Sequence, residues 1–174
     1  LNKKKILISG NVFYKNHNIS YKVLEKLMEL NKEIIFIHIG SGREKINISN
    51  KIKNNIIRLP FIDKMELPNI YKLADILLFP SIYEGFGLPA LEAMSCGTPI
   101  VCSNNPATKE VVGDAALISS HDDINSFTEN ILKLLSNNDL FQEMKQKGLL
   151  RAKLFNINEF HKNLILIYRD EFNK

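Results

Sequence analysis

The sequence has 174 residues, of which 45% are hydrophobic and 24% are charged. This balance is typical of an ordinary globular domain that buries a sizeable core, so we expect a single domain. The formal net charge of +4 comes from lysines interspersed with acidic residues. Such a pattern favours a small anionic ligand over nucleic acid or a membrane surface. No apolar run reaches the roughly 20 residues of a membrane-spanning helix, and no signal-peptide pattern is present.

The cysteine content favours a reduced compartment. Cys96 and Cys102 are the only cysteines. No further cysteine or suitably spaced histidine completes a metal site, so we expect two buried thiols and a cytoplasmic location. The sequence begins with Leu1 rather than Met, which we interpret as the sign of a piece of a longer protein.

Six short, apolar, β-rich runs predict buried parallel strands. They lie at residues 5–9, 34–39, 56–59, 76–79, 100–102 and 116–118. Helical patterns lie between them at 19–30 and 67–74, and only helical patterns follow from residue 124, at 124–135, 140–153 and 159–172. The alternation predicts an α/β fold: a Rossmann-like, doubly wound parallel sheet of about six strands, with helices on both faces and a helical C-terminal third.

Ligands of such sheets bind at the carboxyl ends of the strands, where two glycine turns stand out. After the first run, Gly10 lets a ligand approach the backbone, and Lys15 offers a flexible point charge for a phosphate. The alternative is a polar turn that caps the next helix. After the second run, Gly40-Ser41-Gly42 is either a ligand-binding turn or a simple strand-to-helix turn.

A third loop follows the fourth run and leads into a helix. Pro89 fits only the first turn of a helix, so the helix starts near Gly87 or Leu88. Gly85 and Gly87 expose the unpaired amides of that start, and the helix dipole favours an anion there. A phosphate would fit this position.

Glu84 precedes these amides, and Glu92 lies about one turn inside the helix. Carboxylates accept hydrogen bonds, so a vicinal diol is a natural partner for each. The order of groups therefore predicts a ligand with hydroxyls at both ends and phosphates in the middle, which describes a nucleotide-sugar. The alternative is that Glu92 merely complements the helix dipole.

Seven residues separate Glu84 from Glu92, as in the E-x7-E motif of retaining glycosyltransferases. The surrounding segments E-G-F-G-L-P, E-A-M-x-C-G-T-P and E-V-V-G-D-A-A also match. From about residue 59 to 150 the sequence resembles the C-terminal, donor-binding domain of glycosyltransferase family 4 (glycosyl transferases group 1), which has the GT-B fold. The resemblance implies a retaining, metal-independent hexosyltransferase that needs no cofactor beyond a UDP- or GDP-linked sugar donor.

The resemblance also implies roles for single residues. Glu84, the catalytic candidate, would hold hydroxyls of the transferred sugar, and Glu92 would hold the ribose. The other donor-binding candidates flank the diphosphate or the base: Gly10, Asn11, Lys15, Phe61, Ile62, Gly85, Phe86, Gly87 and Leu88. The family commonly has an arginine directly after the glycine, where this sequence has Asn11. Its absence removes a bidentate phosphate contact.

A GT-B enzyme has a second, N-terminal domain that binds the acceptor, and the resemblance does not include it. We therefore expect this chain to bind donor weakly and to transfer nothing by itself. The missing half would supply the acceptor, a glycan or lipid, and any peripheral contact with the inner face of a membrane. Two alternatives remain: a nucleotide-sugar-binding subunit that works with a separate acceptor-binding chain, and a degenerate half kept for protein interaction.

Other polar residues have structural interpretations. The group His121-Asp122-Asp123 is expected to cap the helix that begins at Ile124 rather than to bind a metal. His38 alternates within an apolar strand and is expected to be a core residue, whereas His17 could contact a phosphate. Glu110 is expected to organise the loop after the fifth strand.

Overall fold

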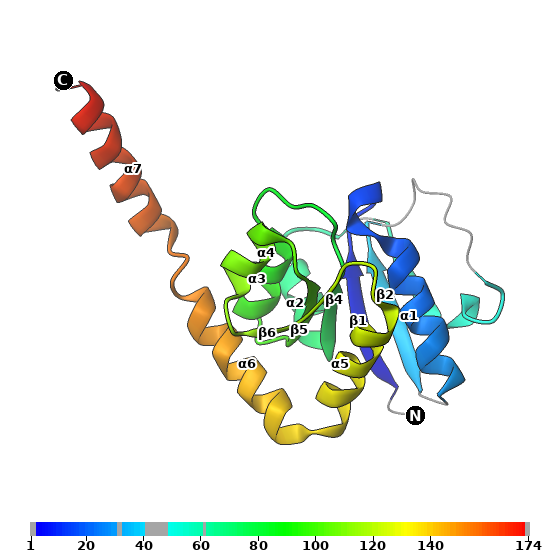
Figure 1. Cartoon of the computed structure of the whole chain (residues 1–174). Coiled ribbons are helices and arrows are strands. Elements are labelled where there is room, and N and C mark those ends of the chain that lie inside the picture. The colour runs from blue at the N-terminus through cyan, green and yellow to red at the C-terminus, as the bar shows by residue number, and fades with distance from the viewer. Residues whose placement is uncertain (1–2, 31–32, 41–48, 61, 173–174) are drawn as a thin grey trace.

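The computed structural model describes residues 3–30, 33–40, 49–60 and 62–172 (Figure 1). Within these ranges six strands form one sheet in the order β3-β2-β1-β4-β5-β6, and every neighbouring pair is parallel. The strands are β1 (Lys4–Ser9), β2 (Ile34–Ile39), β3 (Ile56–Leu59), β4 (Ile76–Phe79), β5 (Ile100–Ser103) and β6 (Ala116–Ser119). This is the Rossmann strand order, and its direction reverses between β1 and β4. The predicted doubly wound sheet is confirmed.

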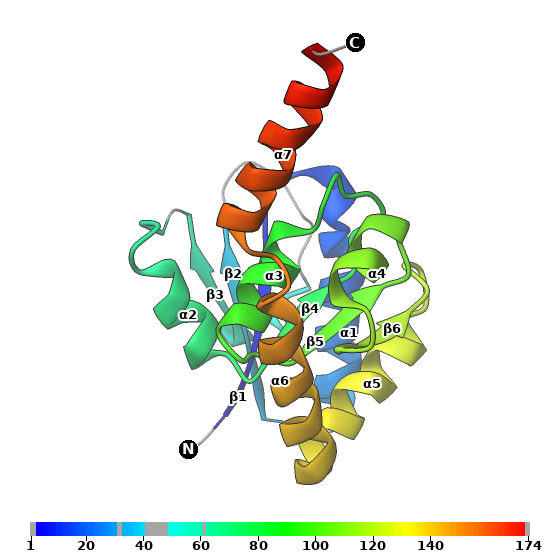
Figure 2. The same ribbon diagram turned by 90° about the vertical axis from the view of Figure 1, so that its left-hand side faces the viewer.

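Helices cover both faces of the sheet (Figures 1 and 2). One face carries α1 (His17–Glu29) and α5 (Ile124–Ser136), and the other carries α2 (Leu67–Leu73), α3 (Leu88–Ser95) and α4 (Pro106–Val112). Alternate residues of β1 point to opposite faces of the sheet. Ile6 and Ile8 pack with α1 and α5 in one core layer, whereas Leu7 packs with α2 and α3 in the other. The central strand β4 is buried along its whole length, as expected for a covered parallel strand.

The C-terminal third is helical, as predicted. α6 (Asn138–Ala152) packs against α3 and α5, whereas α7 (Ile157–Phe172) projects away from the body of the domain (Figure 1). None of the described helices combines the length and the apolar character that crossing a bilayer requires.

The sequence patterns did not predict α4. The helix is short, yet its start is well specified. Pro106 occupies the first turn, and the side chain of Asn105 accepts a hydrogen bond from the amide of Thr108 at 2.9 Å. Glu110 therefore lies on a helix, and its expected place in a loop was wrong. A short 3-10 turn, η1 (Phe13–Lys15), precedes α1, and another, η2 (Lys53–Asn55), precedes β3.

Candidate functional site

The candidate site lies at the carboxyl edge of the sheet, where the loops after β1 and β4 meet. The backbone amide of Ile82 donates to the carbonyl of Tyr14 at 2.8 Å. Asn16, in the left-handed conformation, donates from its side chain to the carbonyls of Pro80 (3.2 Å) and His121 (2.7 Å). Three loops that are distant in the sequence are thus fixed to one another at the point where the strand order reverses.

Gly10 allows the first loop to fold tightly. Its φ is +99°, and a Cβ at this position would lie 2.8 Å from Cγ of Lys15. A side chain would therefore displace Lys15 and strain the backbone. Gly40, at the end of β2, lies directly against it, since a Cβ on Gly40 would be 3.4 Å from the carbonyl carbon of Gly10. Gly40, the described residue of the second predicted turn, therefore packs against Gly10 of the first.

Lys15 and Glu84 form the central feature of the site. Nζ of Lys15 lies 2.7 Å from Oε1 of Glu84, and the two side chains are only 11% and 9% exposed. The ammonium group also lies 4.7 Å from the centre of the Phe79 ring. A charge pair so little exposed needs both partners, because removal of either leaves an uncompensated charge. The sequence placed these residues on the same ligand, and the structure brings them into direct contact.

The start of α3 is open beside this pair. Gly87 is the N-cap residue with φ +104°, and no side chain caps the helix. Within the described ranges, the amides of Phe86, Gly87 and Leu88 have no hydrogen-bond acceptor. Gly85 faces open space, because a Cβ there would meet nothing within 4 Å. The predicted helix start is confirmed, and its free amides and positive dipole end can receive an anion.

The exposed ring of Phe86 is supported from the C-terminal region. It lies edge-on to the ring of Phe155, with ring centres 5.8 Å apart. Arg151 of α6 stands over Phe155 and donates to the carbonyls of Glu110 and Val111 near the end of α4. The glycine loop therefore rests on the end of α6.

Glu92 has a partner that the sequence analysis missed. The hydroxyl of Tyr71, on α2, donates to Oε2 of Glu92 at 2.8 Å. Burial, and after it the nearby charge of Glu92, raises the pKa of Tyr71 above its ordinary value. In the sequence, Tyr71 is only one more large residue in an apolar helical stripe, so nothing distinguished it from an ordinary core residue.

The remaining predicted residues divide into three groups. Ile62 is half-buried in the loop before α2, and Asn11 is half-buried in the turn after Gly10. Phe61 and the Ser41-Gly42 turn lie outside the described residues. Leu88 is exposed on the first turn of α3.

The expected phosphate contact of His17 was wrong. The His17 ring is buried against His38, with ring centres 4.4 Å apart. His38 itself is the predicted core histidine: Nε2 lies 2.9 Å from the carbonyl oxygen of Gly10, and Nδ1 lies 2.7 Å from the hydroxyl of Tyr21. His38 thus contacts the Gly10 turn directly, and His17 packs against His38.

Asp123 caps α5, as predicted, by accepting from the amide of Ser126 at 2.9 Å. Across the described ranges, no three His, Cys, Asp or Glu side chains are grouped as metal ligands.

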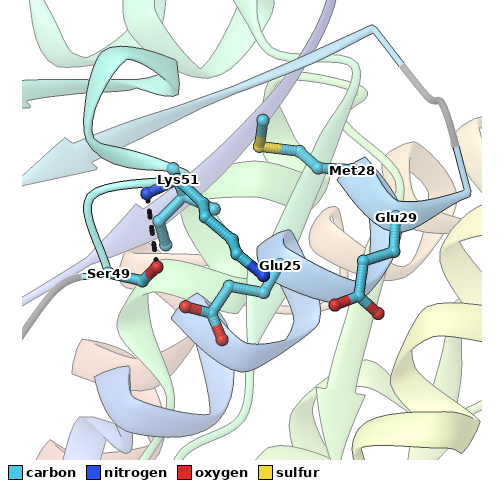
Figure 3. A pocket seen from close by; sticks show the side chains of 6 residues that line it. Glu25, Met28, Glu29, Ser49 and Lys51 are labelled. Atoms are coloured by element: carbon cyan, nitrogen blue, oxygen red, sulfur yellow. Dashed lines mark hydrogen bonds between the residues drawn. The ribbon is translucent and has the colours of Figure 1, made fainter.

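A separate hollow lies against the C-terminal half of α1 (Figure 3). Its labelled lining is Glu25, Met28, Glu29, Ser49 and Lys51, and the amide of Lys51 donates to the Ser49 hydroxyl at 3.3 Å. Because α1 runs back from the Gly10 turn, this hollow lies at the opposite end of the helix from the candidate site. Its two glutamates lie one turn apart on an exposed helix face and converge on no buried group.

Comparison with known proteins places the domain in a family. Residues 1–151 match the family described as glycosyl transferases group 1. The chain belongs to the glycosyl transferases group 1 family. Over 97 residues it is 43% identical to O-antigen chain mannosyltransferase B of Escherichia coli, a match that covers 56% of this chain and 26% of that protein.

Two solved structures share the fold of this glycosyl transferases group 1 chain. Sucrose-phosphate synthase from Thermosynechococcus elongatus superposes with a TM-score of 0.85 at 21% identity, over 99% of this chain and 46% of that one. The C-terminal domain of the glycosyl transferase group 1 protein LpcC from Francisella tularensis gives a TM-score of 0.76 at 22% identity, over 88% of this chain and 85% of that one. The fold is thus that of a GT-B C-terminal domain. The chain spans about a quarter of the mannosyltransferase and under half of the synthase.

Proposed function

We propose that this chain is the donor-binding domain of a retaining, metal-independent glycosyltransferase of family 4. It binds a UDP- or GDP-linked sugar and acts with an N-terminal, acceptor-binding domain outside this sequence. The observation that carries the proposal is the Lys15–Glu84 pair, 2.7 Å apart, beside the uncapped start of α3. A single small site thus offers a cation and free amides for a diphosphate, and a carboxylate for sugar hydroxyls.

Donor binding would exchange one set of partners for another. The diphosphate lies against the amides of Phe86, Gly87 and Leu88 and takes the ammonium group of Lys15. Glu84 then accepts hydrogen bonds from hydroxyls of the sugar in place of Lys15. Each buried charge keeps a partner throughout, which avoids the cost of an unpaired charge.

The same groups serve the chemical step. When the bond between sugar and diphosphate breaks, negative charge grows on the leaving diphosphate. Lys15 and the start of α3 are fixed by the fold before this charge develops, so they stabilise it without reorganisation. This stabilisation does the work that a divalent ion does in metal-dependent transferases. Glu84 keeps the sugar oriented while a hydroxyl of the acceptor, held by the other domain, bonds to the anomeric carbon on the face that the diphosphate leaves. The proton of that hydroxyl passes to the departing diphosphate.

Glu92 extends the site beyond the diphosphate. It is placed to accept hydrogen bonds from the ribose diol, and the segment of Phe61 and Ile62 before α2 would flank the base. The related O-antigen chain mannosyltransferase supports a mannosyl donor and a polysaccharide acceptor as the first to test.

The proposal is tested by titration calorimetry with UDP, GDP, UDP-glucose and GDP-mannose. Glu84→Gln should lose roughly tenfold or more of the preference for a nucleotide-sugar over the free nucleotide, because a hydrogen bond to a charged acceptor is weakened. Lys15→Met should weaken nucleotide and nucleotide-sugar alike, because both carry the diphosphate. Lys15→Arg should restore part of that loss.

Glu129→Gln, on the exposed side of α5, is the matched control and should bind like the wild type. Thermal unfolding of each variant separates lost binding from lost folding. Binding by Glu84→Gln and Lys15→Met that equals the wild type would remove both residues from the site.

Asn11 favours a second candidate, a degenerate half kept for protein interaction. The family commonly has an arginine at this position, and asparagine offers a diphosphate no charge. Asn11→Arg should tighten nucleotide binding if the proposed diphosphate position is right. Absence of any nucleotide binding at millimolar concentration would favour the degenerate half.

A further inference from the structure

Tyr71 is a buried residue that is hydrogen-bonded to Glu92 of the proposed site, and none of the roles assigned above uses it. Its side chain is on α2, with the residue 2% exposed, and its hydroxyl donates to Oε2 of Glu92 at 2.8 Å. We propose that Tyr71 is a positioning residue: it fixes the Glu92 carboxylate for the ribose diol and thereby makes the site prefer ribonucleotides to 2′-deoxyribonucleotides. This inference rests on the proposed function, in which Glu92 receives the ribose.

The geometry of a carboxylate explains why it needs a fixed partner. A glutamate on a helix surface has three rotatable side-chain bonds and samples several rotamers. One strong hydrogen bond from a neighbouring helix selects one of them. The bond occupies Oε2, so Oε1 and the remaining lone pair of Oε2 stay available to accept from two hydroxyls. A vicinal diol supplies two such donors, whereas a 2′-deoxyribose supplies one.

The phenol is a dependable donor in this position. Burial and the adjacent Glu92 charge raise its pKa above the ordinary value, so the hydroxyl stays protonated at any physiological pH. A phenol in this state can only donate to a carboxylate.

Tyr71 is itself held firmly. Its ring lies in the core layer with Ala93 and Met94, and its carbonyl accepts a hydrogen bond from the hydroxyl of Thr98 at 2.7 Å. Thr98 is 4% exposed and lies just before β5. The loop that contains Ile62 leads into α2, so the proposed base segment is close in sequence to the partner of the ribose carboxylate.

A purely structural role is the alternative. A buried phenol needs an acceptor, and Glu92 supplies one whether or not a ligand is bound. The two roles differ in what they predict for ligands. Loss of a structural bond affects every nucleotide equally, whereas loss of a positioning bond weakens nucleotides that offer both ribose hydroxyls to Glu92 more than those that offer one.

The experiment compares UDP with 2′-deoxy-UDP, and GDP with 2′-deoxy-GDP, by calorimetry on wild type, Tyr71→Phe, Glu92→Gln and the double variant. The LpcC structure shows that a domain of this fold stands alone, so the chain itself is used. We expect Tyr71→Phe to reduce the ribose preference by roughly tenfold, the value of one hydrogen bond to a charged group, because the deoxy ligands lose less affinity than the ribo ligands. In the Glu92→Gln background the same substitution should add nothing.

Two further variants complete the design. Tyr168→Phe, on exposed α7, is the matched control for a lost phenol and should change no affinity. Thr98→Val removes the bond to the Tyr71 carbonyl at nearly constant volume, and it should lower the ribose preference in the same direction. It tests the inference even if Tyr71→Phe folds poorly.

Equal weakening of ribo and deoxy ligands by Tyr71→Phe would overturn the inference and leave the donor site intact. An unchanged ribose preference would do the same. Failure of the wild type to bind any of the four nucleotides would instead refute the proposed function, and the inference with it.

Discussion

Two imidazole rings lie against each other beneath the Gly10 turn, and both are buried. Burial, and after it the neighbouring His38, lowers the pKa of His17 from 6.5 to about 3. Burial likewise lowers the pKa of His38. The unfolded chain therefore binds protons on these two rings at a higher pH than the folded domain does.

The acid sensitivity of the domain is the prediction at this scale. Between pH 6.5 and about 3 the unfolded chain binds a proton on His17 and the folded chain does not, so stability is full above pH 6.5 and falls as pH drops below it. His17 contributes up to about 1.4 kcal/mol per pH unit to that slope. Denaturant unfolding from pH 7.5 to 4.5 measures it.

His17→Leu should reduce the slope of stability against pH by an amount that corresponds to close to one bound proton, because leucine cannot titrate. His161→Leu, on exposed α7, is the control and should leave the slope as it is. Parallel stability curves for His17→Leu and the wild type would contradict the assignment of the slope to this ring.

At the scale of the element, the glycine loop before α3 contains two glycines with different constraints. Gly87 has φ +104°, a conformation that L-residues rarely adopt, and its missing Cβ lies an ordinary 3.5 Å from the Thr108 hydroxyl. The obstacle to a side chain there is backbone strain, not space. Gly85 has neither constraint, since nothing lies within 4 Å of its missing Cβ.

Gly87→Ala should therefore lower the free energy of unfolding by about 1–2 kcal/mol, the cost of a left-handed backbone for an L-residue. Gly85→Ala is the matched substitution two residues away and should stay within about 0.5 kcal/mol of the wild type. Urea unfolding at neutral pH gives both values. Equal destabilisation by Gly85→Ala and Gly87→Ala would contradict this explanation. It would show that the loop tolerates no added side chain, whatever the φ of the residue.

At the scale of the whole molecule, α7 stands apart from the two core layers. All its described side chains are exposed, and the two layers draw no residue from it. Phe155, just before it, packs against the layer beside α3 and against Phe86. The folded body of the domain therefore ends near Phe155.

Truncation after Asn156 should shift the unfolding temperature by less than about 2 °C, since it removes few core contacts. Phe155→Ala in the full chain should lower the temperature by about 4 °C, because it removes a half-buried ring. Thermal unfolding followed by circular dichroism at 222 nm measures both. A large drop on truncation would mean that α7 packs on the body of the domain.

The local features of the fold could be read from the sequence. Apolar runs gave the six strands to within about one residue at each end, because a covered parallel strand is apolar on both faces. Pro89 fixed the start of α3, and Asp123 fixed the start of α5. The segments around Glu84 and Glu92 also indicated the glycosyl transferases group 1 family, which the match over residues 1–151 confirmed, whereas family 4 stays a prediction.

The sequence by itself determined the strands, most helices and the candidate residues, since each depends on neighbours along the chain. Only the tertiary structure decided which candidates meet. Lys15 and Glu84 are 69 residues apart, and Tyr71 and Glu92 are 21 apart. Their contacts exist because β4 lies beside β1 and because α2 packs on α3. Periodicity carries no information about such pairings, which is why Tyr71 was missed and His17 was expected to contact a phosphate.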